Sequence, residues 1–326
     1  MARIGVLAYD GCFATQIFAF ADLLQIANRV ARQAGTHAED PFTVSIVSAS
    51  GGSVRTAGGF TSDASTDMAM LEALIVPGFE LVPGDDIAAL LAGWSAEIAS
   101  IAAIGRRGVE VASVCVGAFL LGEAGMLAGR EATTGWLFAT ELATRYPDAT
   151  ITADALIVGD GQVTTTAAFS AVLDLALHVI RCHAGEDVAR RTARITLVAD
   201  NRTSQTAYID RSMLTPSRTG FARSVERWLL ARLQQPYDLA ELSRAFNVST
   251  RTMLRRFAAE TGRTPLDFLQ AARVTTAKRL LESTDSRVAE VMERVGYLDP
   301  GSFRRLFTNE VGVTPAVYRR QFRAAG

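Results

Sequence analysis

The sequence predicts an α/β domain with a mostly parallel sheet, followed by an all-α domain. At 326 residues, the chain is longer than one hydrophobic core usually serves. Strand-like and helix-like segments alternate up to about residue 199, which is the pattern of a parallel sheet with helical connections. A polar, turn-rich stretch follows, and after it every hydrophobic pattern is helical. We therefore expect a first domain at 1–199, a linker at 200–220 and a second domain at 221–326.

The elements of the first domain can be located from hydrophobic spacing and turn residues. The predicted strands are Arg3–Ala8, Phe42–Ala49, Leu74–Val76, Val109–Val114, Ala155–Val158 and Gln162–Thr165. The predicted helices are Gln16–Ala34, Ser95–Arg107, Val116–Ala124, Ala168–His183 and Glu186–Val198. The first of these helices is apolar on more than one face, and the residues outside its core stripe are Phe18, Phe20, Leu23 and Ile26. This second face predicts a homodimer that forms through the first domain.

Composition excludes several classes of protein. Hydrophobic residues make up 49% of the chain and charged residues 21%, a globular balance that excludes a disordered or fibrous chain. We find no signal-peptide pattern, and no uncharged apolar run reaches the ~18–20 residues needed to cross a bilayer. The cysteines Cys12, Cys115 and Cys182 lack CxxC spacing, which favours a reducing compartment. We expect a cytoplasmic protein with no membrane partner.

The net charge of −1 hides a division of charge along the chain. Residues 1–200 hold 12 Lys and Arg against 22 Asp and Glu, a net −10. Residues 201–326 hold 21 against 12, a net +9. A basic part joined to an acidic part indicates that the basic part binds nucleic acid.

The second domain contains an internal repeat. Leu239-Ala240-Glu241-Leu242 recurs 49 residues later as Val288-Ala289-Glu290-Val291. A second set, Phe257, Glu260, Gly262, Thr264 and Pro265, recurs 50 residues later as Phe307, Glu310, Gly312, Thr314 and Pro315. Each copy predicts a short helix, a turn, a second helix, a Gly stop and a further helix. This is the helix-turn-helix unit, whose second helix enters the DNA major groove.

The second helix of each copy has a buried face and an arginine-bearing face. In the first copy, Ser249 is a good N-cap, and Arg251 and Arg255 share a face away from the apolar positions. In the second copy, Asp299-Pro300 starts the helix, and Arg304 and Arg305 point away from the predicted core. Arginine can both read guanine and neutralise phosphate, so these faces are predicted to contact DNA.

Residues 221–326 resemble the DNA-binding domain of the AraC/XylS family of transcription regulators. The motif that carries the resemblance is Gly296-Tyr297, Ser302-Phe303, Arg305, Phe307, Gly312 and Thr314-Pro315-Ala316-Val317-Tyr318-Arg319. The resemblance implies two helix-turn-helix units, joined by a long helix at about 265–281, that bind adjacent major-groove segments of a double-stranded promoter operator. The expected DNA-binding residues are Ser249, Arg251, Leu254, Arg255, Ser302, Arg304 and Arg305. Leu254 suits a thymine methyl group rather than a hydrogen bond.

In the first domain, Cys115 lies at a sharp turn between a strand and a helix. Ser113 and Gly117 flank it at the small-residue positions of a nucleophile elbow. A helix N-terminus can lower the pKa of a cysteine, so Cys115 could be reactive. Pro77-Gly78-Phe79 follows another strand and could present backbone amides in the manner of an oxyanion hole.

Roughly residues 1–190 resemble the PfpI-like members of the class I glutamine-amidotransferase-like superfamily, which implies a flavodoxin-like sandwich. Together the two domains resemble AraC-family regulators of the GlxA type. Enzymes of the superfamily pair the elbow cysteine with a histidine, and the regulator branch commonly reads Ala-Thr-Thr-His-Trp. This chain reads Ala132-Thr133-Thr134-Gly135-Trp136, so we expect no catalytic residue and no enzyme. Two alternatives stay open: a cysteine-dependent hydrolase or glyoxalase, and a regulator that senses redox state through Cys115.

Ligands of open α/β sheets bind outside the carboxyl ends of the strands, where several of these loops meet. We therefore expect a ligand pocket formed by Asp10, Gly78, Phe79, Cys115, Val116, Thr134, Gly135 and Trp136. The resemblance also implies a homodimer, and it suggests a small amine, amino acid or betaine as the effector, whose binding would change the arrangement of the dimer and its affinity for DNA. No cofactor is expected. His178 and Cys182 are four apart on one helix, but no further ligand clusters with them, so no metal is expected either.

Overall fold

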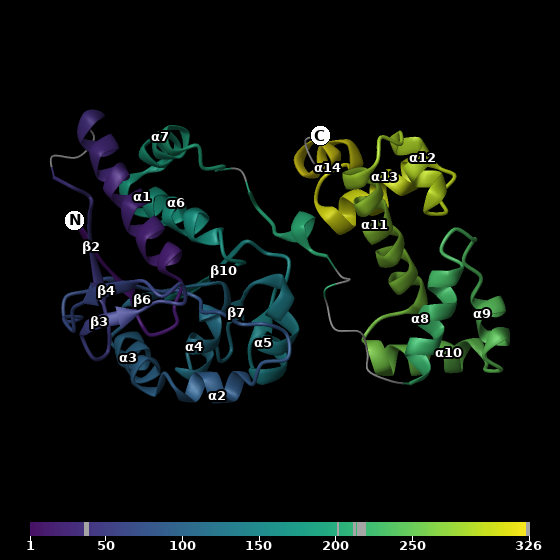
Figure 1. Ribbon diagram of the computed structural model, residues 1–326, viewed down its shortest axis with the longest axis horizontal. Coiled ribbons are helices and arrows are strands. Elements are labelled where there is room, and N and C mark those ends of the chain that lie inside the picture. The colour runs from purple at the N-terminus through teal and green to yellow at the C-terminus, as the bar shows by residue number, and fades with distance from the viewer. Residues whose placement is uncertain (36–38, 201, 211–212, 214–219, 324–326) are drawn as a thin grey trace. The chain divides into compact units, whose positions relative to one another are not determined.

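A computed structural model describes residues 1–35, 39–200, 202–210, 213 and 220–323 (Figure 1). The chain divides into two compact units, Met1–Gln205 and Thr206–Gly326. Within the described residues, no helix is long and apolar enough to span a membrane.

The first unit is built on a six-stranded sheet in the order β2-β1-β5-β6-β10-β9, in which only the pair β9 and β10 is antiparallel. Its strands are β1 (Ala2–Leu7), β2 (Phe42–Val47), β5 (Ala73–Val76), β6 (Glu110–Val114), β9 (Ile157–Asp160) and β10 (Val163–Thr166). Two small sheets accompany it: the hairpin β3 (Gly52–Arg55) and β4 (Thr61–Ala64), and the parallel pair β7 (Glu131–Ala132) and β8 (Thr150–Ile151). The predicted α/β class with a mostly parallel sheet is confirmed.

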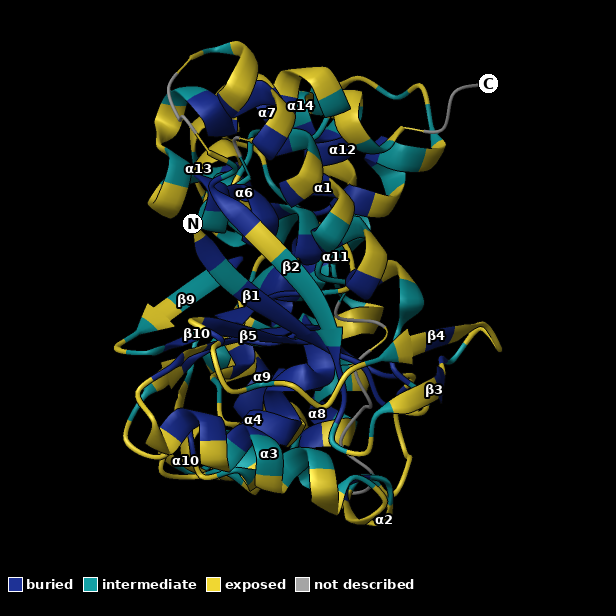
Figure 2. Cartoon of the chain, turned by 90° about the vertical axis from the view of Figure 1, so that its left-hand side faces the viewer, coloured by how far each residue is buried: buried dark blue, intermediate teal, exposed yellow. Residues whose placement is uncertain are grey.

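Helices cover both faces of this sheet (Figure 1). One face carries α1 (Ala14–Gln33), α6 (Ala171–Ala184) and α7 (Glu186–Thr196). The other carries α2 (Ile87–Ala92), α3 (Ser95–Arg106), α4 (Ala118–Glu123) and α5 (Ala139–Arg145), with the short 3-10 helices η1 (Cys115–Gly117) and η2 (Trp136–Phe138). Because both faces are covered, central strands such as β5 are buried along their whole length, whereas the β3–β4 hairpin is largely exposed (Figure 2).

Helix α1 buries the second apolar face that suggested a dimer. Phe20 is fully buried and Leu23 is 4% exposed. The helix packs against both α6 and α7 of the same unit, which accounts for its broad apolar surface. Among the four apolar residues of this helix that suggested a dimer, only Phe18 is exposed, with 41% of its surface accessible. The apolar pattern of α1 therefore reflects packing within one chain, and it no longer argues for a dimer.

The second unit is helical, as predicted. Its helices are η3 (Thr206–Tyr208), α8 (Phe221–Ala231), α9 (Leu239–Ala245), α10 (Thr250–Thr261), α11 (Pro265–Ser283), α12 (Val288–Arg294), α13 (Pro300–Val311) and α14 (Pro315–Phe322). Thr264 starts α11 with a capping box completed by Asp267, and Thr314 starts α14 in the same Thr-Pro context.

Helix α11 joins two separate hydrophobic cores. Leu269, near its start, packs with Met253 and Phe257 of the first helix-turn-helix unit. Leu281, near its end, packs in the core of the second unit, whose other large members include Phe303, Phe307 and Tyr318. Each helix-turn-helix therefore has its own core, as the sequence repeat requires.

The turns of the two helix-turn-helix units share one backbone feature. Asn247 (φ 53°) and Gly296 (φ 82°) are 49 residues apart and both adopt the left-handed conformation. At Gly296 a Cβ would lie within 2.9 Å of backbone atoms of Leu233 and Gln234, so only glycine fits. Asn247 can take the same conformation because asparagine tolerates it better than most residues.

The predicted linker at 200–220 includes residues 201, 211–212 and 214–219, which lie outside the described residues. The described part does not form one separate segment. Ser204 and Gln205 bond to the first unit, and residues from Thr206 to Ile209 pack within the second.

Candidate functional site

Cys115 lies at the sharp turn that follows β6. Its φ of 55° is uncommon for a residue that carries a side chain. The turn is tight because a Cβ on Gly117 would lie 2.7 Å from the carbonyl oxygens of both Val76 and Pro77. The strand, the turn and the helix expected around this cysteine are therefore present, and the thiol lies at the carboxyl edge of the parallel sheet.

The thiol of Cys115 is buried and neutral. Burial raises its pKa from an ordinary value of 9.0 to about 11. The backbone N–H groups of Val116, Gly135 and Phe169 favour the thiolate and lower the pKa, but burial outweighs them. The lowered pKa that a helix N-terminus can cause is thus not found, because the loss of solvation dominates.

The backbone amide of Gly78 already has a partner in this site. Gly78 lies beside Cys115, since a Cβ on the glycine would be 3.4 Å from the Cβ of the cysteine. The fully buried Gln16 of α1 accepts the Gly78 N–H through Oε1 at 2.6 Å. Its Nε2 donates to the carbonyl of Phe169 at 3.2 Å. The amide expected to stabilise an oxyanion therefore binds a side chain of the same unit instead.

The loop Thr134–Trp136 lies against the cysteine from the other side. Thr134 is fully buried, and its hydroxyl donates to the carbonyl of Cys115 at 2.8 Å. A Cβ on Gly135 would lie 3.2 Å from the Sγ of Cys115 and 3.7 Å from the Cα of Ala168. Gly135 thus packs directly on the sulfur, and a side chain at this position would reach the thiol.

Gln205 holds this loop in place. It is 3% exposed, and its Nε2 donates to the carbonyls of Thr134 at 2.8 Å and Ala153 at 2.7 Å. Its Oε1 accepts the N–H of Trp136 at 3.1 Å. One side chain therefore satisfies three backbone groups of two loops beside the cysteine.

Four members of the predicted ligand-binding set lie at the thiol of Cys115. They are Gly78, Val116, Thr134 and Gly135. Asp10 is exposed, and its carboxylate accepts the backbone N–H of Arg55 at 2.8 Å. Phe79 is 1% exposed and packs 4.6 Å from the ring of Trp94. Trp136 is half-buried at the start of η2.

The two described histidines lie near the opposite edge of the sheet. His183 packs against Phe42, the first residue of β2. The charge of Glu110, the first residue of β6, acts on His178. Cys115 follows the last residue of β6, so neither imidazole is beside its thiol. The third histidine, His37, lies outside the described residues.

Within the described residues, no three His, Cys, Asp or Glu side chains are arranged to hold a metal ion. The Sγ of Cys182 lies 3.7 Å from Nε2 of His178 on α6, as their spacing predicted.

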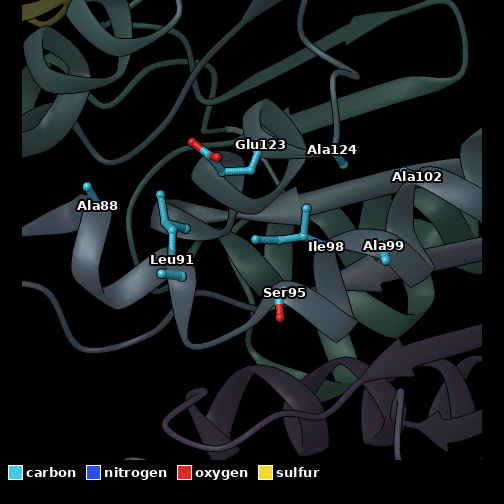
Figure 3. A pocket seen from close by; sticks show the side chains of 9 residues that line it. Ala88, Leu91, Ser95, Ile98, Ala99, Ala102, Glu123 and Ala124 are labelled. Atoms are coloured by element: carbon cyan, nitrogen blue, oxygen red, sulfur yellow. The ribbon is translucent and has the colours of Figure 1, made fainter.

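A hollow of about 380 Å³ lies between α2, α3 and α4 (Figure 3). Leu91 and Ile98 form part of its wall, and Glu123 is the one charged side chain among the nine residues that line it. Tyr146 and Arg145 both donate to the carboxylate of Glu123. Cys115, Gly78 and Gly135 are not among the residues that line this hollow.

In the second unit, helix α10 presents the arginine face that the sequence predicts. The Oγ of Ser249 accepts the N–H of Thr252 at 3.2 Å and starts the helix. Arg251 and Arg255 are exposed, and neither forms an ion pair among the described residues. Leu254 is 36% exposed on the same helix.

Arg256 of α10 differs from these two arginines. It pairs with Glu260 at 3.6 Å and lies 4.2 Å from the ring centre of Phe221. Its guanidinium is therefore engaged within the unit.

Helix α13 presents the second face. Asp299 accepts the N–H of Ser302 at 2.7 Å, and Arg305 donates to the hydroxyl of Ser302 at 3.2 Å. Arg304 is exposed and has no ion-pair partner among the described residues. Leu298, just before the helix, is 89% exposed and was not among the predicted DNA-binding residues.

Sequence reasoning missed Gln16 and Gln205. A signal for Gln16 existed, because a glutamine next to Ile17 in the core stripe of α1 must find buried partners. Gln205 gave no such signal, since it lies in a polar stretch typical of a linker.

Comparison with known proteins agrees with this division. The sequence model described as the DJ-1/PfpI family matches residues 16–182, and that of a helix-turn-helix domain matches residues 242–321. The chain is 25% identical over 301 residues to the HTH-type transcriptional regulator CdhR of Pseudomonas aeruginosa, covering 90% of this chain and 84% of the relative. It is 28% identical over 243 residues to the HTH-type transcriptional regulator GlxA of Rhizobium meliloti, covering 71% of each.

Among solved structures, the crystal structure of a protein from Vibrio parahaemolyticus aligns with this chain. The alignment covers 60% of this chain and 98% of the Vibrio chain, with a TM-score of 0.50 and 18% sequence identity. At this identity the likeness concerns the fold of the first unit alone.

Proposed function

The chain belongs to the DJ-1/PfpI family and continues into an AraC-type helix-turn-helix domain, and from this premise we propose a transcription regulator whose DNA binding responds to a small metabolite. That it is a DNA-binding regulator follows from its helix-turn-helix domain and from its relatives. We propose residues 1–199 as the sensing and dimerisation domain, 200–220 as the linker and 221–326 as the domain that binds a promoter operator in the cytoplasm.

The paired arginine faces are the single observation that carries the DNA-binding part of this proposal. Arg251 and Arg255 on α10, and Arg304 on α13, are exposed without an ion-pair partner among the described residues. Exposed guanidinium groups on recognition helices can neutralise phosphates and read guanine. The net charge of +9 over residues 201–326 adds a long-range attraction for DNA.

Sensing is proposed for the residues around Cys115, and the effector class is a small amine, amino acid or betaine. The net charge of −10 over residues 1–200 favours the approach of a ligand that carries a cationic group. The neutral hydrogen-bonding side chains at this site are Gln16, Thr134 and Gln205, each of which bonds to a backbone group. A ligand that binds here would replace some of these backbone groups as their partner.

A non-catalytic role for Cys115 has three supports. The pKa of its thiol is about 11, so the nucleophilic thiolate is scarce near neutral pH. The histidine position of similar enzymes is Gly135, and neither described histidine lies beside the sulfur. The amide of Gly78, which an oxyanion would need, is bonded to Gln16.

The experiment that tests the proposal combines selection of DNA sequences by the protein with measurement of its thermal stability in the presence of small ligands. The purified protein would be used to enrich sequences from a random pool of double-stranded DNA, and its melting temperature would be followed with amines, amino acids and betaines. We expect one enriched DNA motif and a saturable rise in melting temperature with one ligand class, since a ligand of the folded state stabilises it. No enriched motif would refute the DNA-binding part, and no response to any compound would refute the sensing part.

A further inference from the structure

The segment Arg202–Ile209, here called the strap, connects the elbow loops to the second helix-turn-helix unit. Gln205 is its last residue in the first compact unit, and Thr206 is its first residue in the second. Each anchoring contact described below lies within one unit.

On the first unit, the strap is held at several points. The guanidinium of Arg202 pairs with the buried Asp174 of α6, with Nε–Oδ1 at 3.0 Å, and its Nη1 donates to the hydroxyl of Ser170 at 3.2 Å. Ser204 forms a β-bridge with Ala155. Gln205 ends this part and bonds through its side chain to the loop Thr134–Trp136. The strap is therefore fixed to the loop Thr134–Trp136, in which Gly135 packs on the sulfur of Cys115.

On the second unit, the strap is held by the only lysine of the chain. Lys278 of α11 is 8% exposed, and its Nζ donates to the carbonyl of Ile209 at 2.5 Å. Tyr208 packs edge-on against Phe322 at 5.0 Å, and Ala207 packs against the core formed by α11, α12, α13 and α14. The short helix η3 also lies against α13.

These two sets of anchors are separated by a single peptide bond. Consecutive Cα atoms are always about 3.8 Å apart, so the backbone of Gln205 cannot shift appreciably without moving Thr206. A long flexible linker would absorb such a shift, whereas here Gln205, the last anchored residue of the first unit, is followed directly by the first residue of the second. The path ends at α13, the recognition helix of the second helix-turn-helix unit.

We propose that the strap transmits the state of the elbow loops to the second helix-turn-helix unit, with Gln205 as the positioning residue on one side and Lys278 on the other. The first helix-turn-helix unit has its own core and is not in this path. The inference rests on the proposed function only in that a small metabolite would be the signal. The coupling between the elbow loops and the second helix-turn-helix unit itself requires neither ligand nor DNA.

Hydrogen–deuterium exchange of the intact protein tests this coupling directly. Thr134→Val removes the bond from the Thr134 hydroxyl to Cys115 at nearly constant shape. We expect faster exchange at 134–136 and also at 206–209 and in α13, by at least about threefold, with α10 unchanged. In a Gln205→Ala background the same substitution should add nothing at 206–209 or in α13, because the connection is already broken.

Two further variants distinguish coupling from a general loss of stability. Gln162→Ala is the matched control, since the side chain of Gln162 also bonds to a backbone carbonyl of the first unit, that of Gly105 at 3.0 Å, but is not in contact with the strap. It should leave 206–209 unchanged. Lys278→Met should speed exchange at 206–209 and, by reciprocity, at 134–136.

Changes in Thr134→Val that stay within the first unit, or equal effects of Gln162→Ala and Gln205→Ala at 206–209, would overturn the proposal. Either result would leave the DNA selection described above unaffected, so failure of the strap and failure of the proposed function can be told apart.

Discussion

Gly135 packs so closely on Cys115 that a Cβ on the glycine would lie 3.2 Å from the Sγ of the cysteine. The residue at position 135 therefore determines what the thiol can do. With glycine there, the position supplies no imidazole, neither His178 nor His183 lies beside the sulfur, and burial keeps the thiol protonated.

This contact predicts the effect of filling the position. Gly135→Ala should lower the free energy of unfolding by roughly 1–3 kcal/mol, because one methyl group crowds a well-packed site. Chemical denaturation would measure the loss. Gly159→Ala provides a comparison, since a Cβ there would have its nearest neighbour at 3.7 Å. An equally stable Gly135→Ala protein would show that the site is more open than the structure indicates.

The three cysteines should differ in reactivity. Cys182 is exposed, whereas burial raises the pKa of both Cys12 and Cys115 to about 11. A thiol-specific disulfide reagent at pH 7 should modify one thiol quickly in the native protein and three in denaturant. Cys182→Ser should abolish the fast phase. Fast modification of Cys115 in that variant would instead favour the redox-sensing alternative.

The same two buried thiols predict how stability depends on pH. In the unfolded chain they ionise near pH 9, while in the folded protein they stay protonated up to about pH 11. Their contribution to stability is therefore full below pH 9 and is lost as the pH rises from 9 toward 11. Denaturant unfolding across this range, compared with Cys115→Ala, should show a smaller loss in the variant. An identical slope in both proteins would mean that Cys115 does not titrate as described.

The turn of the second helix-turn-helix should depend on glycine. Gly296→Ala combines a left-handed φ of 82° with a Cβ that would lie 2.8 Å from the carbonyl oxygen of Gln234. We expect a loss of roughly 2–4 kcal/mol in unfolding free energy together with weaker DNA binding. Asn247→Gly, at the equivalent turn of the first unit, should change stability by less than about 0.5 kcal/mol. Similar losses in both variants would contradict this assignment.

The sequence predicts much of the fold because its signals are local. Buried strands such as β5, stopped by Pro77-Gly78, and the repeat that places Asn247 and Gly296 in equivalent turns follow from residue patterns alone. The β3–β4 hairpin was missed because its residues alternate weakly and are mostly exposed. The apolar pattern of α1 was not evidence for a dimer, because a sequence pattern cannot distinguish burial against α6 and α7 from burial against a second chain.

The candidate site was predicted only in part, for a related reason. Cys115, Gly78 and Thr134 follow strands or lie in loops that a parallel sheet brings to one edge, so their proximity could be expected. Asp10 also follows a strand, but its carboxylate binds the backbone of Arg55, a long-range contact that no local pattern encodes. Gln16 and Gln205 each form several long-range hydrogen bonds, which are visible only in three dimensions.

Salt should weaken DNA binding steeply. Neutralising phosphates releases counterions, so a protein that makes 6–10 phosphate contacts loses about 10³–10⁵ in affinity between 50 and 200 mM salt. Titration of the selected operator at several salt concentrations would give the slope. A slope near zero would contradict binding through the arginine faces of α10 and α13.

The most direct measurement of the central claim is the affinity of the full chain and its Arg255→Ala and Arg305→Ala variants for the selected operator at fixed salt. Each variant should bind more weakly by roughly 1–3 kcal/mol. Arg106→Ala, an exposed arginine of the first unit, serves as the charge-matched control and should bind nearly as well as the original chain. Footprinting should show two contacted major-groove segments about one helical turn apart. Unchanged affinity in both Arg255→Ala and Arg305→Ala would show that these helices do not read the operator.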